Sequence, residues 1–291
     1  MSSKVEKRPG SGGAAMSRKQ KAINFGIDAF LISVGLLMIL PLVFLVANAF
    51  KTPQEMLRWP PSIIPSDPTF ANIRTVLADT PLLRWIFNSF VFALLSSISI
   101  LATSSIAGYV LAKFPSKTMT FLFAVILATA IVPFEVYMIP LYFQVKGLGL
   151  LNNLWGMLIG YLVMSFGIFL IRQNVMHAIP DELLEAARID GAGEFWIFFV
   201  IVLPLLRGAL GALAVLAFFQ AWTAFAWPLI LATTRDSYTI EVGLALFQTG
   251  FTVDLGRLSA ASALVLIPSV TLFVLLRRNF VQGIASTGLK E

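Results

Sequence analysis

Apolar residues along this chain are gathered into long segments that carry almost no charge. Five of these segments contain no charged side chain, and another is interrupted only by Glu135; in chain order they are 29–50, 85–112, 118–143, 147–171, 208–234 and 258–276. A helix needs about 20 apolar residues to cross a bilayer, because hydrocarbon offers the backbone no hydrogen-bond partners. The pattern predicts an all-α polytopic membrane protein with six transmembrane helices.

One more apolar segment, 195–206, is only 12 residues long and has Pro204 near its end. It is too short to cross the hydrocarbon core, so we expect it to lie at the membrane surface and to lead into the fifth span.

The composition of the chain points to the same class of protein. Of the 291 residues, 58% are hydrophobic and 12% are charged, and there is no cysteine. Soluble domains contain about 25% charged residues, so these charges are too few to coat a water-soluble surface. The composition excludes a soluble enzyme, a disordered regulator and a disulfide-stapled secreted domain.

Lysine and arginine are distributed unequally between the two sides that these spans define. Of them, 14 lie on the side of both termini and of the 172–207 loop, and 7 lie on the other side. Because basic loops stay in the cytoplasm, we expect both termini and the 172–207 loop there. The net charge of +6 is then explained by the basic residues on the cytoplasmic side of the membrane, and no nucleic-acid binding is expected. The chain divides into a flexible cytoplasmic tail at 1–24, a transmembrane domain at 25–276 and a cytoplasmic C-terminal tail at 277–291.

The cytoplasmic loop contains a segment that predicts a short helix. Pro180 suits its first helical position, and Asp181 and Glu182 complement the positive end of the helix dipole. Gly191 suits a C-cap, because glycine adopts a positive φ without strain.

This predicted helix is amphipathic. Leu183, Leu184 and Ala187 are expected to share one face, with Glu185 and Arg188 paired at i,i+3 on its flank. Such a helix suits docking into a groove of a cytoplasmic partner, or it is a connector packed under the bundle.

The spacing in this loop resembles the Glu-Ala-Ala signature of ABC importer permeases. That signature has a glycine after three further residues and then, nine residues on, Ile-x-Leu-Pro; here Glu185-Ala186-Ala187 is followed by Gly191 and by Ile201-Val202-Leu203-Pro204. The resemblance covers nearly the whole chain and narrows to the smaller permease of the maltose-type carbohydrate importers, to which the segments 50–53, 107–109 and 139–142 are also similar.

The resemblance implies a function and a set of partners. It implies the permease subunit of an ATP-driven importer of a sugar, oligosaccharide or related polyol, in the inner or plasma membrane of a bacterium or archaeon. Its partners would be a second permease, an ABC ATPase dimer, an extracytoplasmic solute-binding protein and membrane lipid. ATP and Mg would be held by the ATPase, with no cofactor on this non-enzymatic chain. By the same resemblance, the ATPase-docking residues of the coupling helix are Glu185, Ala186, Ala187, Asp190 and Gly191.

The fifth span contains candidates for a substrate path, because sugars are bound by aromatic stacking and by amide and hydroxyl hydrogen bonds. These candidates are Gln220, Trp222, Thr223 and Trp227. Gln220 would be costly in lipid, and Thr223 and Trp227 follow it at i+3 and i+7, which predicts a shared face. The alternative is polar contact between helices together with an interfacial aromatic belt.

Glu135 is the remaining candidate for the substrate path. It lies between Pro133 and Pro140, so it either lines a cavity at an irregular stretch of backbone or sits at a helix end near external water. His177 is the single histidine, and without cysteines it predicts no metal site.

The residues support three rival functions unequally. A secondary transporter or channel would need a chain of intramembrane ionisable groups, for which Glu135 alone is thin support. A membrane-embedded enzyme would need clustered acids or histidines at depth, or a Ser–His arrangement, and the sequence has none of these. The same importer machinery acting on a glycerol-phosphate-type solute is the third alternative.

Overall fold

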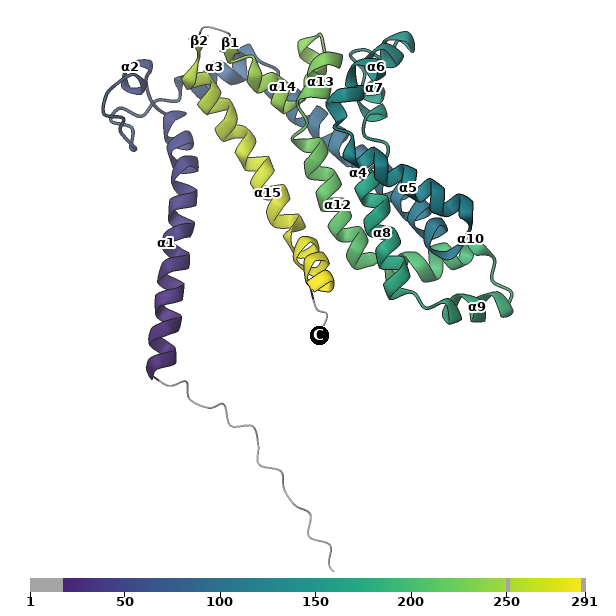
Figure 1. Cartoon of the computed structure of the whole chain (residues 1–291). Coiled ribbons are helices and arrows are strands. Elements are labelled where there is room, and N and C mark those ends of the chain that lie inside the picture. The colour runs from purple at the N-terminus through teal and green to yellow at the C-terminus, as the bar shows by residue number, and fades with distance from the viewer. Residues whose placement is uncertain (1–17, 250–251, 289–291) are drawn as a thin grey trace, which may run out of the picture.

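The computed structural model describes residues 18–249 and 252–288, and this part of the chain is a helical bundle with one short hairpin (Figure 1). In chain order the elements are α1 Arg18–Asn48, α2 Pro53–Met56, α3 Ala71–Asp79, α4 Leu82–Lys113, α5 Lys117–Ile131, α6 Phe134–Gly147, α7 Leu154–Ile159, α8 Ser165–Ala178, α9 Asp181–Ile189, α10 Glu194–Trp196, the π-helical turn η1 Ile197–Val202, α11 Leu203–Leu205, α12 Arg207–Trp222, α13 Ala226–Leu231, η2 Arg235–Ser237, α14 Ile240–Ala245, β1 Gln248–Thr249, β2 Thr252–Val253 and α15 Leu255–Gly288. The helix α9, the start of α1 and the end of α15 lie at one end of the bundle, opposite α2, α3, α13 and the hairpin.

In the described part of the chain, three helices, α1, α4 and α15, are long and apolar enough to cross a membrane. They correspond to the predicted spans 29–50, 85–112 and 258–276. Counting each of two bent helix pairs as one span gives up to five. Of the predicted N-terminal tail at 1–24, residues 1–17 lie outside the described part, and α1 begins at Arg18; α15 continues from the last span to Gly288.

The predicted span 118–143 is not one straight helix, which corrects the prediction. The chain bends by 100° between α5 and α6. Pro133 lies at the break, where its ring disfavours the helical conformation at Val132, which is extended at ψ 117°.

The predicted span 147–171 is also not continuous. It contains the short helix α7, then an irregular stretch at 160–164, and α8 continues past its expected end to Ala178. The backbone at this break is satisfied from α4, where Ser99 Oγ and Thr103 Oγ1 both donate to the carbonyl oxygen of Leu162. Hydropathy did not reveal the break, because an apolar stretch reads the same whether it is helical or irregular.

The predicted span 208–234 is interrupted at 223–225, where α12 ends and α13 has not begun. The segment 195–206 forms α10, η1 and α11, which are bent by 78° from α12. It therefore leads into α12 at an angle, and its predicted place at the membrane surface stays a prediction.

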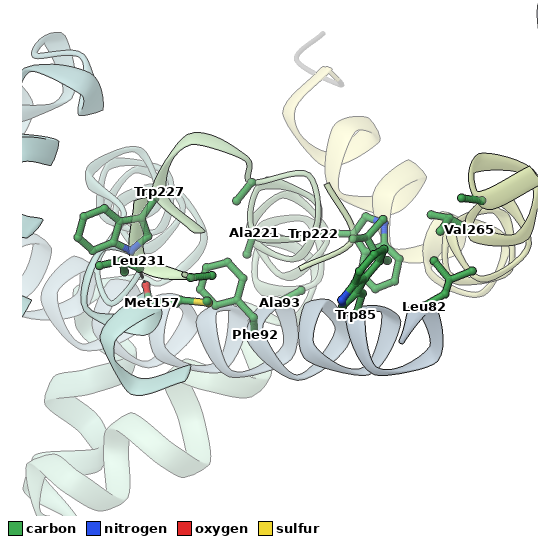
Figure 2. Close-up of a cluster of buried hydrophobic side chains, with 14 of the residues drawn as sticks. Leu82, Trp85, Phe92, Ala93, Met157, Ala221, Trp222, Trp227, Leu231 and Val265 are labelled. Carbon is green, nitrogen blue, oxygen red and sulfur yellow. Dashed lines mark hydrogen bonds between the residues drawn. The ribbon is translucent and has the colours of Figure 1, made fainter. Parts of the chain in front are cut away.

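The helix α4 passes through two hydrophobic cores. In the first, Leu82, Trp85 and Phe92 pack with buried residues of α7, α12, α13 and α15 (Figure 2). In the second, Ile100 and Tyr109 pack with α8, α9, η1 and α12. One long helix therefore ties the two halves of the bundle together.

Small residues allow α4 and α8 to approach closely. A Cβ added at Gly108 would lie 2.8 Å from Ile171 Cγ2 and 2.9 Å from the backbone nitrogen of Arg172, and one added at Gly167 would lie 2.5 Å from Ser104 Oγ. Buried serines line the same helix, and Ser97 and Ser105 hydroxyls donate to carbonyls one turn earlier, as is common in membrane helices.

We expect Gly108→Ala to destabilise the protein. The added methyl group overlaps backbone as well as side-chain atoms, and overpacking of this kind costs about 1–3 kcal/mol. The matched control is Gly208→Ala, since a Cβ there meets nothing within 4 Å. Thermal unfolding of the purified protein in detergent is expected to show a lower Tm for Gly108→Ala only. An equal Tm for the two variants would contradict the close packing of α4 and α8.

Candidate functional site

The helix α9 begins and ends where local chemistry dictates. Pro180 precedes it in an extended conformation at ψ 144°, so Pro180 is the N-cap and not the first helical residue as predicted. At the other end Gly191 has φ +85°, its N–H donates to the carbonyl of Arg188, and the N–H of Ala192 donates to the carbonyl of Ala187. These two bonds form a Schellman motif, which confirms the predicted glycine cap.

Only one of the two predicted leucines of α9 is in the core. Leu184 is buried, whereas Leu183 is 41% exposed, so the predicted apolar face is only partly covered. Glu185 and Ala186 are exposed, and Ala187 is half-buried. Leu184 inserts into the core with α4 and α8, Ala187 packs against that core, and the exposed residues of the helix face outward.

The outward side of α9 forms a shallow groove with the segment that follows it. This α9 groove has a volume of about 610 Å³ and is lined by Leu183, Ala186, Ala187, Asp190, Gly191 and Trp196, among others. Four of the five residues predicted to dock an ATPase lie in it, and Glu185 is exposed beside it.

The first end of α9 is fastened to α4. Lys113, the last residue of α4, donates from Nζ to the carbonyl oxygen of Ile179 at 2.6 Å and forms an ion pair with Asp181. The Lys113 side chain is only 7% exposed, so this ion pair is largely shielded from water on one side.

The second end of α9 is fastened to α4 through α10. Arg188 Nε donates to Glu194 Oε1 at 2.7 Å, and the Tyr109 hydroxyl of α4 donates to Glu194 Oε2 at 3.1 Å. The predicted pairing of Glu185 with Arg188 is therefore wrong, because the glycine turn brings Glu194 within reach of the guanidinium. The hydrogen bond from Arg188 lowers the pKa of the Glu194 carboxyl below its usual range.

The predicted substrate-path residues are only partly brought together. Glu135, Gln220 and Trp227 line one cavity of about 490 Å³, which we call the bend cavity. The cavity lies where three breaks in the helices meet, namely those between α5 and α6, α7 and α8, and α12 and α13. Tyr161 and Phe225 line it too.

Trp222 and Thr223 lie elsewhere. Trp222 is buried, stacks on Phe218 and donates from Nε1 to Ser269 of α15 at 3.2 Å. Thr223 is the C-cap residue of α12, and its hydroxyl donates to the carbonyl of Phe219. The predicted face shared with Trp227 is wrong, because the helix ends at Trp222.

Trp227 is a wall of the bend cavity whose polar atom is already used. Its Nε1 donates to the carbonyl oxygen of Met157 at 2.8 Å, and its ring meets Phe134 edge-on at 5.7 Å. Gly160 leaves room for the indole, since a Cβ there would lie 2.8 Å from Nε1. Trp227 therefore offers an apolar surface to the cavity.

A second cavity was missed by sequence reasoning. This α14 cavity, of about 420 Å³, is lined by Leu45, Phe225, Glu241, Leu244, Ala245, Gln248, Leu258, Ser259 and Ser262. Burial raises the pKa of the Glu241 carboxyl. The one local signal was a single acid between Ile240 and Val242 in an external segment, a pattern equally common on ordinary surfaces.

Within the described ranges, no group of three or more potential ligands is placed to hold a metal ion.

Comparison with known proteins assigns the chain to a family. Residues 104–286 match the binding-protein-dependent transport system inner membrane component, and the chain belongs to this family. It is therefore a multi-pass permease subunit of an ABC importer, as the Glu-Ala-Ala spacing predicted. The α9 groove and both fastenings of α9 lie within the matched residues.

Individual relatives are similar over most of their length. The arabinooligosaccharides transport system permease protein AraQ of Halalkalibacterium halodurans is 32% identical over 88% of this chain and 93% of its own. The sn-glycerol-3-phosphate transport system permease protein UgpE of Yersinia enterocolitica is 30% identical over 90% of this chain and 97% of its own. A solved bacterial ABC transporter that imports the acidic polysaccharide alginate has the same fold, with a TM-score of 0.75 at 22% identity over 91% of this chain and 99% of the matched chain.

We expect Glu194→Gln to loosen α9 without lowering overall stability. The variant weakens the bonds to Arg188 and Tyr109, while exposed ion pairs contribute at most about 1 kcal/mol to global stability. Hydrogen exchange at 181–196 should quicken relative to Glu182→Gln, an exposed acid on the same helix with no ion pair among the described residues.

The pH dependence of this exchange has a defined sign. A carboxyl with a lowered pKa in the folded state contributes stability above its unfolded pKa and loses it as pH falls through the folded value. Wild-type protection should therefore fall in the acid range, below the usual carboxyl value of 4.5, and show no such step in Glu194→Gln. Identical exchange in the two proteins at neutral pH would contradict the fastening.

Proposed function

We propose that this chain is one of two permease subunits in an ATP-driven importer of a sugar, oligosaccharide or related polyol, and that α9 is the helix through which an ATPase moves it. The chain has six spans with both termini in the cytoplasm. The three long helices and the two bent pairs supply five, and α7 with α8 supplies the sixth.

The observation that carries the proposal is the fastening of α9 at both ends. The helix α9 exposes a groove to the outside, and Lys113 and Glu194 hold the helix to α4. A partner that docks in the groove and moves α9 therefore moves α4 as well. Force applied at the groove reaches α4, and through α4 both hydrophobic cores. Glu185, Ala186, Ala187, Asp190 and Gly191 dock the ATPase.

The helix α1 supports the proposal that a second permease subunit is present. This helix is long and apolar, yet none of its apolar stretch is buried, and its helix neighbour is α15 (Figure 1). A bare helix of this kind suits packing against another membrane subunit.

We assign the remaining partners to the two ends of the bundle. The ATPase dimer, with ATP and Mg bound to it and no cofactor on this chain, docks at the α9 end. An extracytoplasmic solute-binding protein delivers the solute at the end with α2, α3 and the hairpin. The complex lies in the inner or plasma membrane of a bacterium or archaeon.

The substrate enters through the cavity where aromatic rings and polar groups meet. Glu135, Gln220 and the apolar ring of Trp227 line the bend cavity and match the chemistry that recognises hydroxyl groups and sugar faces. Relatives are named for both neutral and phosphorylated solutes, so a glycerol-phosphate-type solute is the second candidate.

We expect Gly191→Ala to uncouple transport from ATP hydrolysis. A left-handed backbone costs an L-residue about 1–2 kcal/mol, which changes the population of the capped loop by about tenfold. The matched control is Gly208→Ala, which lies outside the α9 groove, because a Cβ meets nothing within 4 Å at either glycine and, of the two, only Gly191 has a positive φ. Reconstituted vesicles should show less transport per ATP hydrolysed for Gly191→Ala alone. An equal ratio of transport to ATP hydrolysis in the two variants, at equal expression, would contradict the proposed role of α9.

Affinity purification from native membranes tests the assembly. We expect stoichiometric recovery of a second permease and an ATPase. Recovery of this chain alone, or as a homo-oligomer that still transports, would contradict an ATP-driven importer.

A further inference from the structure

The bend cavity and the α14 cavity lie on either side of one residue. Phe225 follows the end of α12 and lines both cavities. It belongs to the irregular stretch 223–225, where the backbone changes direction between α12 and α13. The two cavities therefore share Phe225 as a lining residue and are neighbours in the bundle.

Among the described residues, each cavity is lined by one carboxylate and by no basic side chain. Glu135 lines the bend cavity and Glu241 lines the α14 cavity, and none of the described residues lining either cavity is a lysine, arginine or histidine. Glu241 forms no ion pair or hydrogen bond with the part of the chain that the structure describes. Within the described part of the chain, neither carboxylate has a hydrogen-bond or ion-pair partner that would keep it from the cavity it lines.

Several external bases that could have neutralised these acids are engaged elsewhere. Arg84 pairs with Asp236, and Arg257 pairs with Asp79 and Asp254. Lys51 is buried, and its Nζ donates to Asn48 and to the carbonyl oxygen of Ser62. These cations are held by their own partners and not turned toward the cavities.

The other polar groups that line the cavities have the chemistry to hydrogen-bond hydroxyls. Gln220 and Gln248 each offer an amide donor and acceptor, and Ser259 and Ser262 offer hydroxyls. The rings of Tyr161, Phe225 and Trp227 offer flat apolar surfaces suited to the C–H faces of a sugar.

We propose that the solute passing these two cavities is uncharged and hydroxyl-rich, and that Glu135 and Glu241 accept its hydroxyl hydrogens and exclude phosphorylated or carboxylated solutes. This inference rests on the proposed importer function and chooses between its two substrate classes. A single anionic group about 6 Å from one carboxylate, at an effective dielectric constant near 20, is disfavoured by about a hundredfold.

The absence of cysteine from this chain allows the charge of each cavity to be read directly. Gln220→Cys reports on the bend cavity and Gln248→Cys on the α14 cavity. In the assembled complex, each is modified with a cationic and an anionic methanethiosulfonate, and the two rates are normalised to a free thiol. Leu57→Cys, at an 82% exposed external position outside both cavities, is the control.

We expect the cationic reagent to react at least about tenfold faster than the anionic one inside the cavities, and nearly equally at position 57. Glu135→Gln should abolish the preference at position 220, and Glu241→Gln should abolish it at position 248. Equal rates in the wild-type background, or a preference for the anionic reagent, would overturn the inference, including the case in which a partner subunit supplies a base.

Uptake by the intact complex separates this inference from the proposed function. ATP-driven uptake of a neutral oligosaccharide but not of sn-glycerol 3-phosphate is the expected result. ATP-driven uptake of the phosphate ester would overturn the charge inference alone. Uptake of either solute without ATP would overturn the importer itself.

Discussion

The close approach of α4 to α8 is the contact on which the rest of the molecule depends. Gly108 leaves no room for a methyl group between itself and the backbone of α8, and Gly167 leaves none against Ser104. Lipid tails are as apolar as leucine side chains, so helices in a membrane associate through tight packing and hydrogen bonds. This packing positions the end of α4, where Lys113 and Tyr109 contact the loop that contains α9.

Two fastenings at opposite ends give α9 a fixed orientation on α4. One fastening alone would let the short helix pivot, whereas Lys113 and Glu194 act together with the buried Leu184 between them. The breaks in the other helices serve a different purpose. At 132–133, 160–164 and 223–225 they open a polar cavity within the bundle, and irregular backbone at membrane depth is tolerated where it lines such a cavity. The α9 end of the chain is therefore held by two side-chain contacts, whereas the middle of the bundle is irregular around a cavity.

The sequence predicted those features of the structure that depend on interactions between residues close together in the chain. The long spans α1, α4 and α15 follow from hydropathy, and the end of α9 follows from the positive φ that Gly191 adopts. The breaks did not follow, because an apolar stretch at 147–171 has the same composition whether or not Ser99 and Thr103 cap its carbonyl. The partner of Arg188 depended on a turn that brings Glu194 back over the helix. Glu241 became a candidate only when folding placed it beside Gln248 and Ser259.

The central claim is that α9 and α4 move as one body when the ATPase acts. Because the chain has no cysteine, pairs of spin labels can be placed on it cleanly. One pair joins Ile189 of α9 to Ile98 of α4, and a second joins Ile189 to Leu37 of α1; all three side chains are exposed. Distances are measured by electron-spin resonance in the assembled transporter, without nucleotide and with ATP trapped. An unchanged 98–189 distance with a shifted 37–189 distance is the predicted result. A 98–189 distance that shifts as much as the other would contradict the account.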